Sequence, residues 1–304
     1  MSGQITNKIM MIRPANFGFN SETAVNNSFQ SAPDNDLENT ISQSAIKEFD
    51  AMVEKLQIHG IEVKVIEDTP KPIKPDAIFP NNWLSFHNNN TLITYPMFAQ
   101  NRRTERRDDI IKEFEESLGY DVRYKFEFYE SENLYLEGTG SMILDRVNKI
   151  VYACISPRTD IQVLDKFCVL MGYRKLVFHA YDIDGALIYH TNVMMCVGQD
   201  FAIVCLECIH SDDEKEELID LLESSGKEII EISLDQVNQF AGNMLQLLTD
   251  QMSGILVMSQ SAYTSLEADQ IDKIRAHSQI LALDIPIIEK YGGGSVRCMM
   301  AEIF

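Results

Sequence analysis

The chain has 304 residues, of which 45% are hydrophobic and 24% charged, a composition typical of globular proteins that can bury a large core. Lysine and arginine total 26 against 46 aspartates and glutamates, so the formal net charge is −20. This charge repels phosphate backbones and anionic lipid surfaces, which argues against nucleic acid and membranes as partners.

The N-terminal stretch MSGQITNKIMMIRP lacks the pattern of a secretory signal, and no window approaches eighteen consecutive apolar residues. We therefore expect a cytoplasmic protein. Its six cysteines are then expected to be free thiols, and we expect neither a metal nor a cofactor.

The predicted elements repeat in the order strand, strand, helix, strand. The first unit joins the two chain ends, because 295–304 offers one strand, whereas 8–14, 38–59 and 61–67 offer a strand, a helix and a strand. Four complete units follow: strands 78–87 and 91–96, helix 105–119 and strand 121–129; strands 138–145 and 149–156, helix 159–173 and strand 174–181; strands 191–198 and 200–208, helix 212–226 and strand 227–233; strands 242–249 and 253–259, helix 264–278 and apolar stretch 280–288.

Polar residues near the heads of successive units recur at a period of about fifty, which is typical of propellers and arrays. Because the terminal strands must pair to complete one unit, we predict an α/β fold, a closed five-fold pseudosymmetric propeller forming a single domain over 1–304. The residues that mark the period are Asn82, Glu137, His190, Asn192, Asn243 and Cys298.

Such a ring brings the heads of its units to one central region. There Cys298 supplies a thiol nucleophile, His190 a base or acid, and Glu137 a carboxylate that orients the imidazole. The sequence therefore predicts a Cys–His–Glu catalytic site with Asn82 and Asn243 as neighbours. Taken singly, each residue also has an ordinary structural interpretation, such as a buried thiol.

The segments GGGSVRCM near the C-terminus, LEGTGSM around Glu137 and HTN at 190–192 resemble the amidinotransferase and arginine deiminase (guanidino-group modifying, pentein) superfamily over nearly the whole chain. They are most similar to its citrulline-utilisation hydrolase branch. The resemblance implies a five-fold α/β propeller. It also implies that Cys298 attacks the central carbon of a guanidino or ureido group. By the same resemblance, His190 protonates the leaving amine and then activates water, and Glu137 binds substrate nitrogens.

Two positions depart from the arginine-binding members that the chain resembles, which have aspartates where this chain has Asn82 and Asn192. On a strand, His190 and Asn192 would lie on the same face. Amides leave a buried guanidinium poorly compensated, so a neutral ureido group such as that of citrulline fits better. The alternative is that Asn81, Asn82 and Asn192 are turn or capping residues.

An amino-acid substrate also needs a partner for its α-carboxylate. The segment NRRTERR places arginines near the start of a predicted helix, an unfavourable end for cations, and we expect Arg102 or Arg103 to bind the carboxylate. The competing interpretation is a solvated helix face paired with neighbouring acids. Asn16 and Phe17 are candidates for a pocket wall or lid, and an ordered loop is the alternative.

The favoured function is hydrolysis of citrulline to ornithine, carbon dioxide and ammonia through a covalent adduct on Cys298. Arginine deiminase or amidinotransferase chemistry remains an alternative because Glu137 still supplies a negative charge. A non-catalytic propeller that binds a ligand is a further alternative, although retention of Cys298, His190 and Glu137 argues against it. The expected partner is a small amino acid, and homo-oligomer formation stays open.

Overall fold

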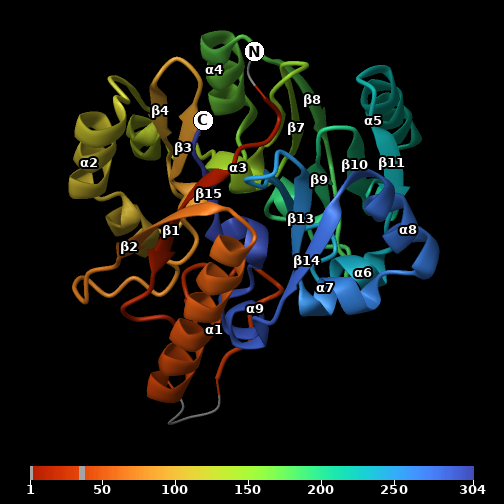
Figure 1. Cartoon of the computed structure of the whole chain (residues 1–304). Helices are drawn as coiled ribbons and strands as arrows, with labels where there is room; N and C mark the ends of the chain where they lie inside the picture. The colour runs from red at the N-terminus through yellow and green to blue at the C-terminus, as the bar shows by residue number, and fades with distance from the viewer. Residues whose placement is uncertain (1–2, 34–37) are drawn as a thin grey trace.

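The computed structural model describes residues 3–33 and 38–304. It contains five three-stranded sheets, each with its first two strands antiparallel and its last two parallel, and the longer helices lie outside the strands around the molecule, whereas the short helix α3 (Gly138–Ser141) lies near the centre (Figure 1). The strands of the five sheets are β15 (Ala301–Glu302), β1 (Lys8–Arg13) and β2 (Glu62–Glu67); β3 (Leu84–His87), β4 (Thr91–Thr94) and β5 (Val122–Lys125); β6 (Ile143–Asp145), β7 (Ile150–Cys154) and β8 (Arg174–Phe178); β9 (Met195–Val197), β10 (Phe201–Val204) and β11 (Glu228–Glu231); β12 (Leu245–Leu248), β13 (Gly254–Ser259) and β14 (Gln279–Leu283).

The main helices connect the second and third strands of each sheet, as a parallel pair requires. They are α1 (Glu38–Ile58), α2 (Asp108–Leu118), α4 (Ile161–Met171), α5 (Asp212–Ser224) and the pair α7 (Gln260–Ser265) and α8 (Ala268–His277). Shorter helices are α3 (Gly138–Ser141), α6 (Leu234–Val237) and α9 (Pro286–Gly292). The 3₁₀ helices are η1 (Pro80–Asn82), η2 (Asn101–Glu105), η3 (Glu127–Glu132), η4 (Thr191–Val193), η5 (Leu206–Cys208) and η6 (Val296–Met299).

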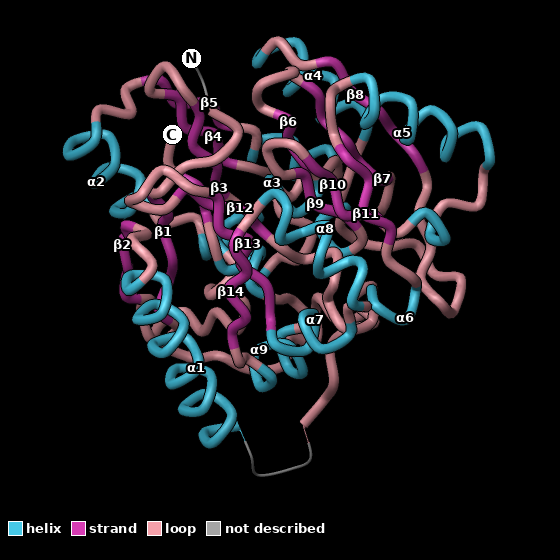
Figure 2. Tube along the Cα trace, turned by 45° about the vertical axis from the view of Figure 1, so that its right-hand side comes forward, coloured by secondary structure: helices cyan, strands magenta, loops and turns pink. Residues whose placement is uncertain are grey.

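The strand–strand–helix–strand order confirms the predicted five-module architecture, and the two ends of the chain do share one sheet. Strand β15 pairs antiparallel with β1, in the register Ile9 with Glu302 and Met10 with Ala301. The tube view in Figure 2 shows the same arrangement, with strands inside and the longer helices outside.

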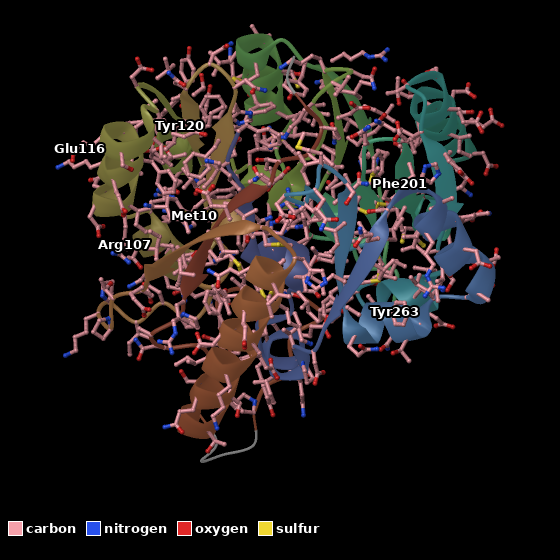
Figure 3. The ribbon with its side chains drawn as sticks, viewed as in Figure 1. Met10, Arg107, Glu116, Tyr120, Phe201 and Tyr263 are labelled. Atoms are coloured by element: carbon pink, nitrogen blue, oxygen red, sulfur yellow. The ribbon has the colours of Figure 1, made fainter. Side chains whose placement is uncertain are left out.

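Burial follows the same division between inside and outside. Met10 on β1 is fully buried, whereas Glu116 on α2 is exposed and points away from the body (Figure 3). In the described part of the chain, residues 3–33 and 38–304, there is no helix whose length and apolar character would let it cross a membrane.

The apolar stretch 280–288, predicted as one strand, is divided in the structure. Strand β14 ends at Leu283 and helix α9 begins at Pro286, a residue whose fixed φ favours the first turn of a helix. Helix α9 ends at Gly292, and Gly293 is its left-handed cap with φ of 61°. Gly292 and Gly293, the first two glycines of the run 292–294, therefore end helix α9, and η6 begins after the run.

Candidate active site

Short helical turns at the heads of the modules carry the predicted catalytic residues. Glu137 is the N-cap of α3, His190 is the N-cap of η4, and Cys298 lies within η6. The turns pack on one another, because α3 contacts η1 and η4, and η1 contacts η6. The heads of the modules therefore do converge.

This corrects the expectation that His190 and Asn192 share a strand face and that Cys298 lies in a strand. Strand β9 begins only at Met195, and β15 only at Ala301. A 3₁₀ helix rises about 2 Å per residue against about 3.3 Å in a strand, so these turns gather more polar groups into a small space.

A hydrogen bond joins His190 to Glu137, with 2.8 Å between Nε2 and Oε2. Both side chains are buried, and the other Glu137 oxygen accepts a hydrogen bond of 2.9 Å from the backbone N–H of Phe98. Burial raises the pKa of Glu137, but Arg158 at 3.6 Å, His190 and Arg102 outweigh it and bring the pKa to about 2. Burial lowers the pKa of His190 to about 4 despite Glu137. The pair is therefore a carboxylate with a neutral imidazole at pH 7.

Two amides surround the thiol of Cys298. The Nδ2 atoms of Asn192 and Asn243 lie 3.4 Å and 3.3 Å from its Sγ. The amide of Asn243 is held in this orientation because its Oδ1 accepts a hydrogen bond from the backbone N–H of Arg297. Two N–H donors at this distance can stabilise negative charge on sulfur, which the nucleophilic form of cysteine requires.

Cys298 and His190 line one small cavity, although Cys298 is only 4% exposed. The cavity combines a nucleophile, an imidazole, two guanidinium groups and a carboxylate, so it can accept a small polar molecule with charged ends. Its lining consists of Thr23, Asn27, Asp76, Phe79, Asn82, Arg102, Arg158, Tyr189, His190, Gly292, Gly293, Gly294 and Cys298.

Arg102 fixes the orientation of Asn82 in this cavity. Its Nη1 donates to Asn82 Oδ1 at 2.9 Å, while its Nε and Nη2 hold the two oxygens of Glu105, each at 2.9 Å. Burial raises the pKa of Glu105 to about 7 although Arg102 opposes the shift. The amide oxygen of Asn82 is thus occupied, and its buried Nδ2 has no hydrogen-bond partner among residues 3–33 and 38–304.

The structure adds Asp76, Arg158 and Tyr189 to the site, and the sequence analysis missed all three. Asp76 Oδ2 accepts hydrogen bonds from Asn20 at 2.7 Å and Thr23 at 3.2 Å, and its buried Oδ1 has no hydrogen-bond partner in the described part of the chain. Burial raises the pKa of Asp76, and the nearby guanidinium groups oppose the shift. The sequence signal that could have identified Asp76 is its position six residues before Asn82, directly ahead of the apolar residues 77–79.

The segment 20–30, which we call the cover segment, contributes Thr23 and Asn27 to the cavity lining. Arg158 donates from Nε to Asn26 Oδ1 and from Nη2 to the Thr23 carbonyl, both at 2.9 Å. At its other end, Asn27 and Gln30 donate to the carbonyls of 293 and 292. The residues that line the cavity therefore also hold the cover segment in place.

Six of the eight predicted substrate-binding residues lie outside the cavity lining, which includes only Asn82 and Arg102 of the set. Arg103 donates to the Met97 carbonyl at 3.1 Å and lies 3.5 Å from Glu130, and Asn16 donates to the Pro70 carbonyl. Phe17 is buried in the core, and none of the residues that the structure describes is a hydrogen-bond partner of the buried Asn81 side-chain amide. Asn192 and Asn243 contact the Cys298 thiol but are not among the residues that line the cavity.

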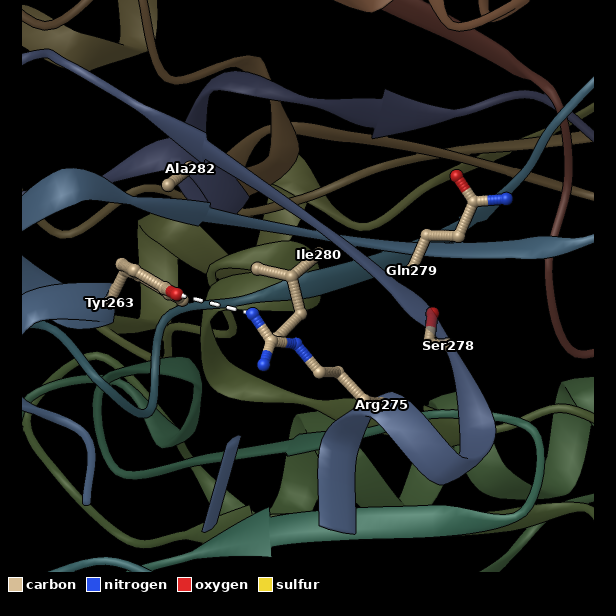
Figure 4. A pocket seen from close by; sticks show the side chains of 6 residues that line it. All are labelled: Tyr263, Arg275, Ser278, Gln279, Ile280 and Ala282. Carbon is tan, nitrogen blue, oxygen red and sulfur yellow. Dashed lines mark hydrogen bonds between the residues drawn. The ribbon is translucent and has the colours of Figure 1, made fainter. Parts of the chain in front are cut away.

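A wider depression of about 640 Å³ lies against β14 and α8, on the outside of the fifth module. Figure 4 shows its six side chains, among which the Tyr263 hydroxyl accepts a hydrogen bond of 3.5 Å from Arg275. It is lined by Tyr263, Arg275, Ser278, Gln279, Ile280 and Ala282, so it offers no thiol, imidazole or carboxylate. The smaller cavity is the candidate active site.

Comparison with known proteins identifies the family of the chain. A family model described as N,N dimethylarginine dimethylhydrolase, eukaryotic, matches residues 13–304. No curated protein sequence gives a significant match.

Among solved structures, the chain is similar to the N-terminal domain of ArgZ bound to substrate, an arginine dihydrolase from the ornithine–ammonia cycle in cyanobacteria. The TM-score is 0.75 at 14% identity, and 97% of each chain is covered. The chain covers only 40% of whole ArgZ. It is also similar to AgrE in complex with L-arginine, with a TM-score of 0.76, 15% identity, and coverage of 98% of this chain and 40% of that one. A dimethylarginine dimethylaminohydrolase carrying an adduct with S-methyl-L-thiocitrulline gives 0.65 at 15% identity, covering 98% and 100%.

Proposed function

The chain belongs to the family of N,N dimethylarginine dimethylhydrolase, eukaryotic, a family of hydrolases within the pentein superfamily, and we propose that its reaction is the hydrolysis of citrulline. The products would be ornithine, carbon dioxide and ammonia. Cys298 would be the nucleophile, with His190 as proton carrier and Glu137 as the carboxylate that orients it.

The observation that carries the choice of substrate is the fixed amide of Asn82. Since Arg102 occupies its Oδ1, the amide cannot turn without placing N–H groups against a guanidinium, and it presents Nδ2 as a donor. A ureido group has an oxygen that accepts this hydrogen bond. A guanidinium has only donors, so it would leave the Asn82 N–H groups unsatisfied in a buried place.

The first half-reaction follows from the neutral state of His190. The imidazole takes the proton from the Cys298 thiol, and Sγ attacks the ureido carbon while negative charge builds on the ureido oxygen. The Asn82 N–H group stabilises this charge. The protonated His190 beside the Glu137 carboxylate then gives its proton to the leaving amine, and a thiocarbamoyl group remains on Cys298.

The second half-reaction uses the same groups in reverse order. His190 takes a proton from water as the oxygen attacks the thiocarbamoyl carbon, and the proton returns to sulfur when the C–S bond breaks. The released carbamate decomposes to carbon dioxide and the second amine. The positive charge of Arg102 and Arg158 suits the α-carboxylate of the substrate, and the free Oδ1 of Asp76 is an acceptor for its α-ammonium.

A second candidate is hydrolysis of arginine or an N-methylated arginine, as the family description suggests. The specific observation in its favour is Asp76, since a second buried carboxylate in the cavity can compensate a cationic guanidinium. This candidate would use the same adduct on Cys298 and release citrulline.

The two candidates are separated by incubating the protein with citrulline, arginine and Nω,Nω-dimethylarginine and quantifying ornithine and citrulline by mass spectrometry. We expect ornithine from citrulline, and none from the Cys298→Ala variant. Citrulline formed from either arginine, with citrulline itself left intact, would contradict the proposal.

Replacing the Asn82 donor by an acceptor sharpens this test. We expect Asn82→Asp to move the ratio of kcat/KM values for citrulline and arginine at least about 100-fold toward arginine, because the buried donor becomes a carboxylate. Asn238→Asp makes the same chemical change at an exposed position after α6 and is expected to leave the ratio unchanged. A constant ratio in Asn82→Asp would show that this amide does not select the substrate.

A further inference from the structure

A second small cavity shares no lining residue with the active site. Its walls come from Gln4 and Ile5 and from residues in or beside the first strands of four modules, namely β6, β9, β12 and β15. The catalytic turns precede these strands in the chain. The second cavity therefore lies toward the ends of the strands that are farther from the catalytic turns. We call it the rear cavity.

The charged groups of the rear cavity are two arginines and one glutamate, all buried. Arg297 donates from Nη2 to Glu302 Oε2 at 2.8 Å, and Nη2 of Arg146 lies 3.6 Å from the same oxygen. Among the residues that line the cavity, Glu302 is the one carboxylate. Two guanidinium groups therefore share one negative charge, and a surplus of positive charge is buried inside a chain whose net charge is −20.

The surplus of positive charge also contributes to lowered pKa values of neighbouring groups. Burial lowers the pKa of His87 well below its usual range, and Arg146, whose Nη1 lies 3.4 Å from His87 Nδ1, lowers it further. Burial likewise lowers the pKa of Lys149, again with a contribution from Arg146. The Arg146 guanidinium also lies 3.9 Å from the ring centre of Phe304, whose π face compensates the charge only in part.

We propose that the rear cavity binds a small monoanionic carboxylate between Arg146 and Arg297. Guanidinium groups match carboxylates in geometry, and a single negative charge balances the surplus left by Glu302. The remaining walls are apolar side chains and the amides of Gln4 and Gln246, which leave the anion little competition from water. This site is separate from the reaction at Cys298 and does not depend on which substrate that reaction uses.

Acetate is a suitable probe, because it is small, carries one charge and can replace chloride at constant ionic strength. We expect acetate to raise the Tm of the protein with saturation, by about 4 °C at 100 times its Kd for a chain of this length. The rise should be absent in Arg146→Gln. It should persist in Arg13→Gln, which removes one positive charge from the outer part of the first sheet.

The Glu302→Gln variant provides a second test, in which we expect the affinity for acetate to rise and not to fall. Removing this carboxylate frees Arg297 and leaves both arginines without their shared partner, so acetate should bind at least about tenfold more tightly. This variant also serves if Arg146→Gln fails to fold. An equal acetate response in wild type and Arg146→Gln, as binding at the active-site arginines would give, overturns the proposal. Unchanged or weaker binding to Glu302→Gln overturns it as well.

Discussion

The protonation state of His190 offers a direct test of the catalytic arrangement, because the proposed mechanism needs a neutral imidazole that can accept the thiol proton. The pKa of His190 is about 4 in the folded protein, against 6.5 for an unperturbed histidine. The folded state therefore binds fewer protons than the unfolded chain between these two values. Stability from this residue is complete above pH 6.5 and is lost as the pH falls toward 4.

The size of the effect follows from the two pKa values. Between pH 7.5 and pH 5, protonation of His190 in the unfolded chain alone lowers the free energy of unfolding by about 2 kcal/mol. Other buried groups titrate in the same range. Glu105, with a pKa of about 7, changes stability in the opposite direction, because its folded pKa is raised. The total pH dependence therefore cannot identify His190.

A comparison with His190→Gln isolates the residue. Glutamine keeps an N–H donor for Glu137 and does not titrate, while the other groups remain. We expect the free energy of unfolding, measured by urea titration, to fall by about 2 kcal/mol more in the wild type than in the variant when the pH goes from 7.5 to 5. Equal losses, or a larger loss in the variant, would mean that folded His190 is an imidazolium at pH 5, and the thiol would then need another base.

Three further predictions concern neighbouring parts of the site. Glu137→Gln should lower the free energy of unfolding by about 3–5 kcal/mol, since buried guanidinium groups lose their counter-charge, and a loss below 1 kcal/mol in urea titration would contradict this. Gly140→Ala should reduce kcat/KM at least about 100-fold, because a Cβ there would lie 2.5 Å from the Asn82 amide, whereas Gly18→Ala meets no atom within 4 Å and should be neutral. Asn243→Ala should slow iodoacetamide alkylation of Cys298 about tenfold, and an unchanged rate would exclude its amide as a thiolate donor.

The module order was predictable because each unit repeats the same local pattern, and the unit period placed Cys298, His190, Glu137 and Asn243 together. Asp76 and Arg158 were not predictable in this way. Both lie outside the regular strands, and their places depend on contacts with the cover segment, which is more than fifty residues away along the chain. The assignment of the whole chain to a single domain stays a prediction.

The arginines of NRRTERR show a related limit of prediction from sequence. Their repetition in NRRTERR indicated an anion site, yet side chains one residue apart go to different places: Arg102 enters the cavity and Arg103 lies against Glu130. Which arginine turns inward is decided by the buried partner Glu105, and sequence spacing does not reveal that pairing.

The cover segment has a kinetic consequence. Because the contacts of Arg158 with Thr23 and Asn26 join the cover segment to the cavity lining and Cys298 is nearly buried, we expect a substrate to reach Cys298 after these contacts break. The same guanidinium holds the Glu137 carboxylate in its charged form. Each opening of the cover segment therefore disturbs the charged state of Glu137, on which proton transfer depends. Each closing of the segment restores that state. We then expect the closing of the eleven residues 20–30 to limit turnover, and an increase in solvent viscosity to slow it.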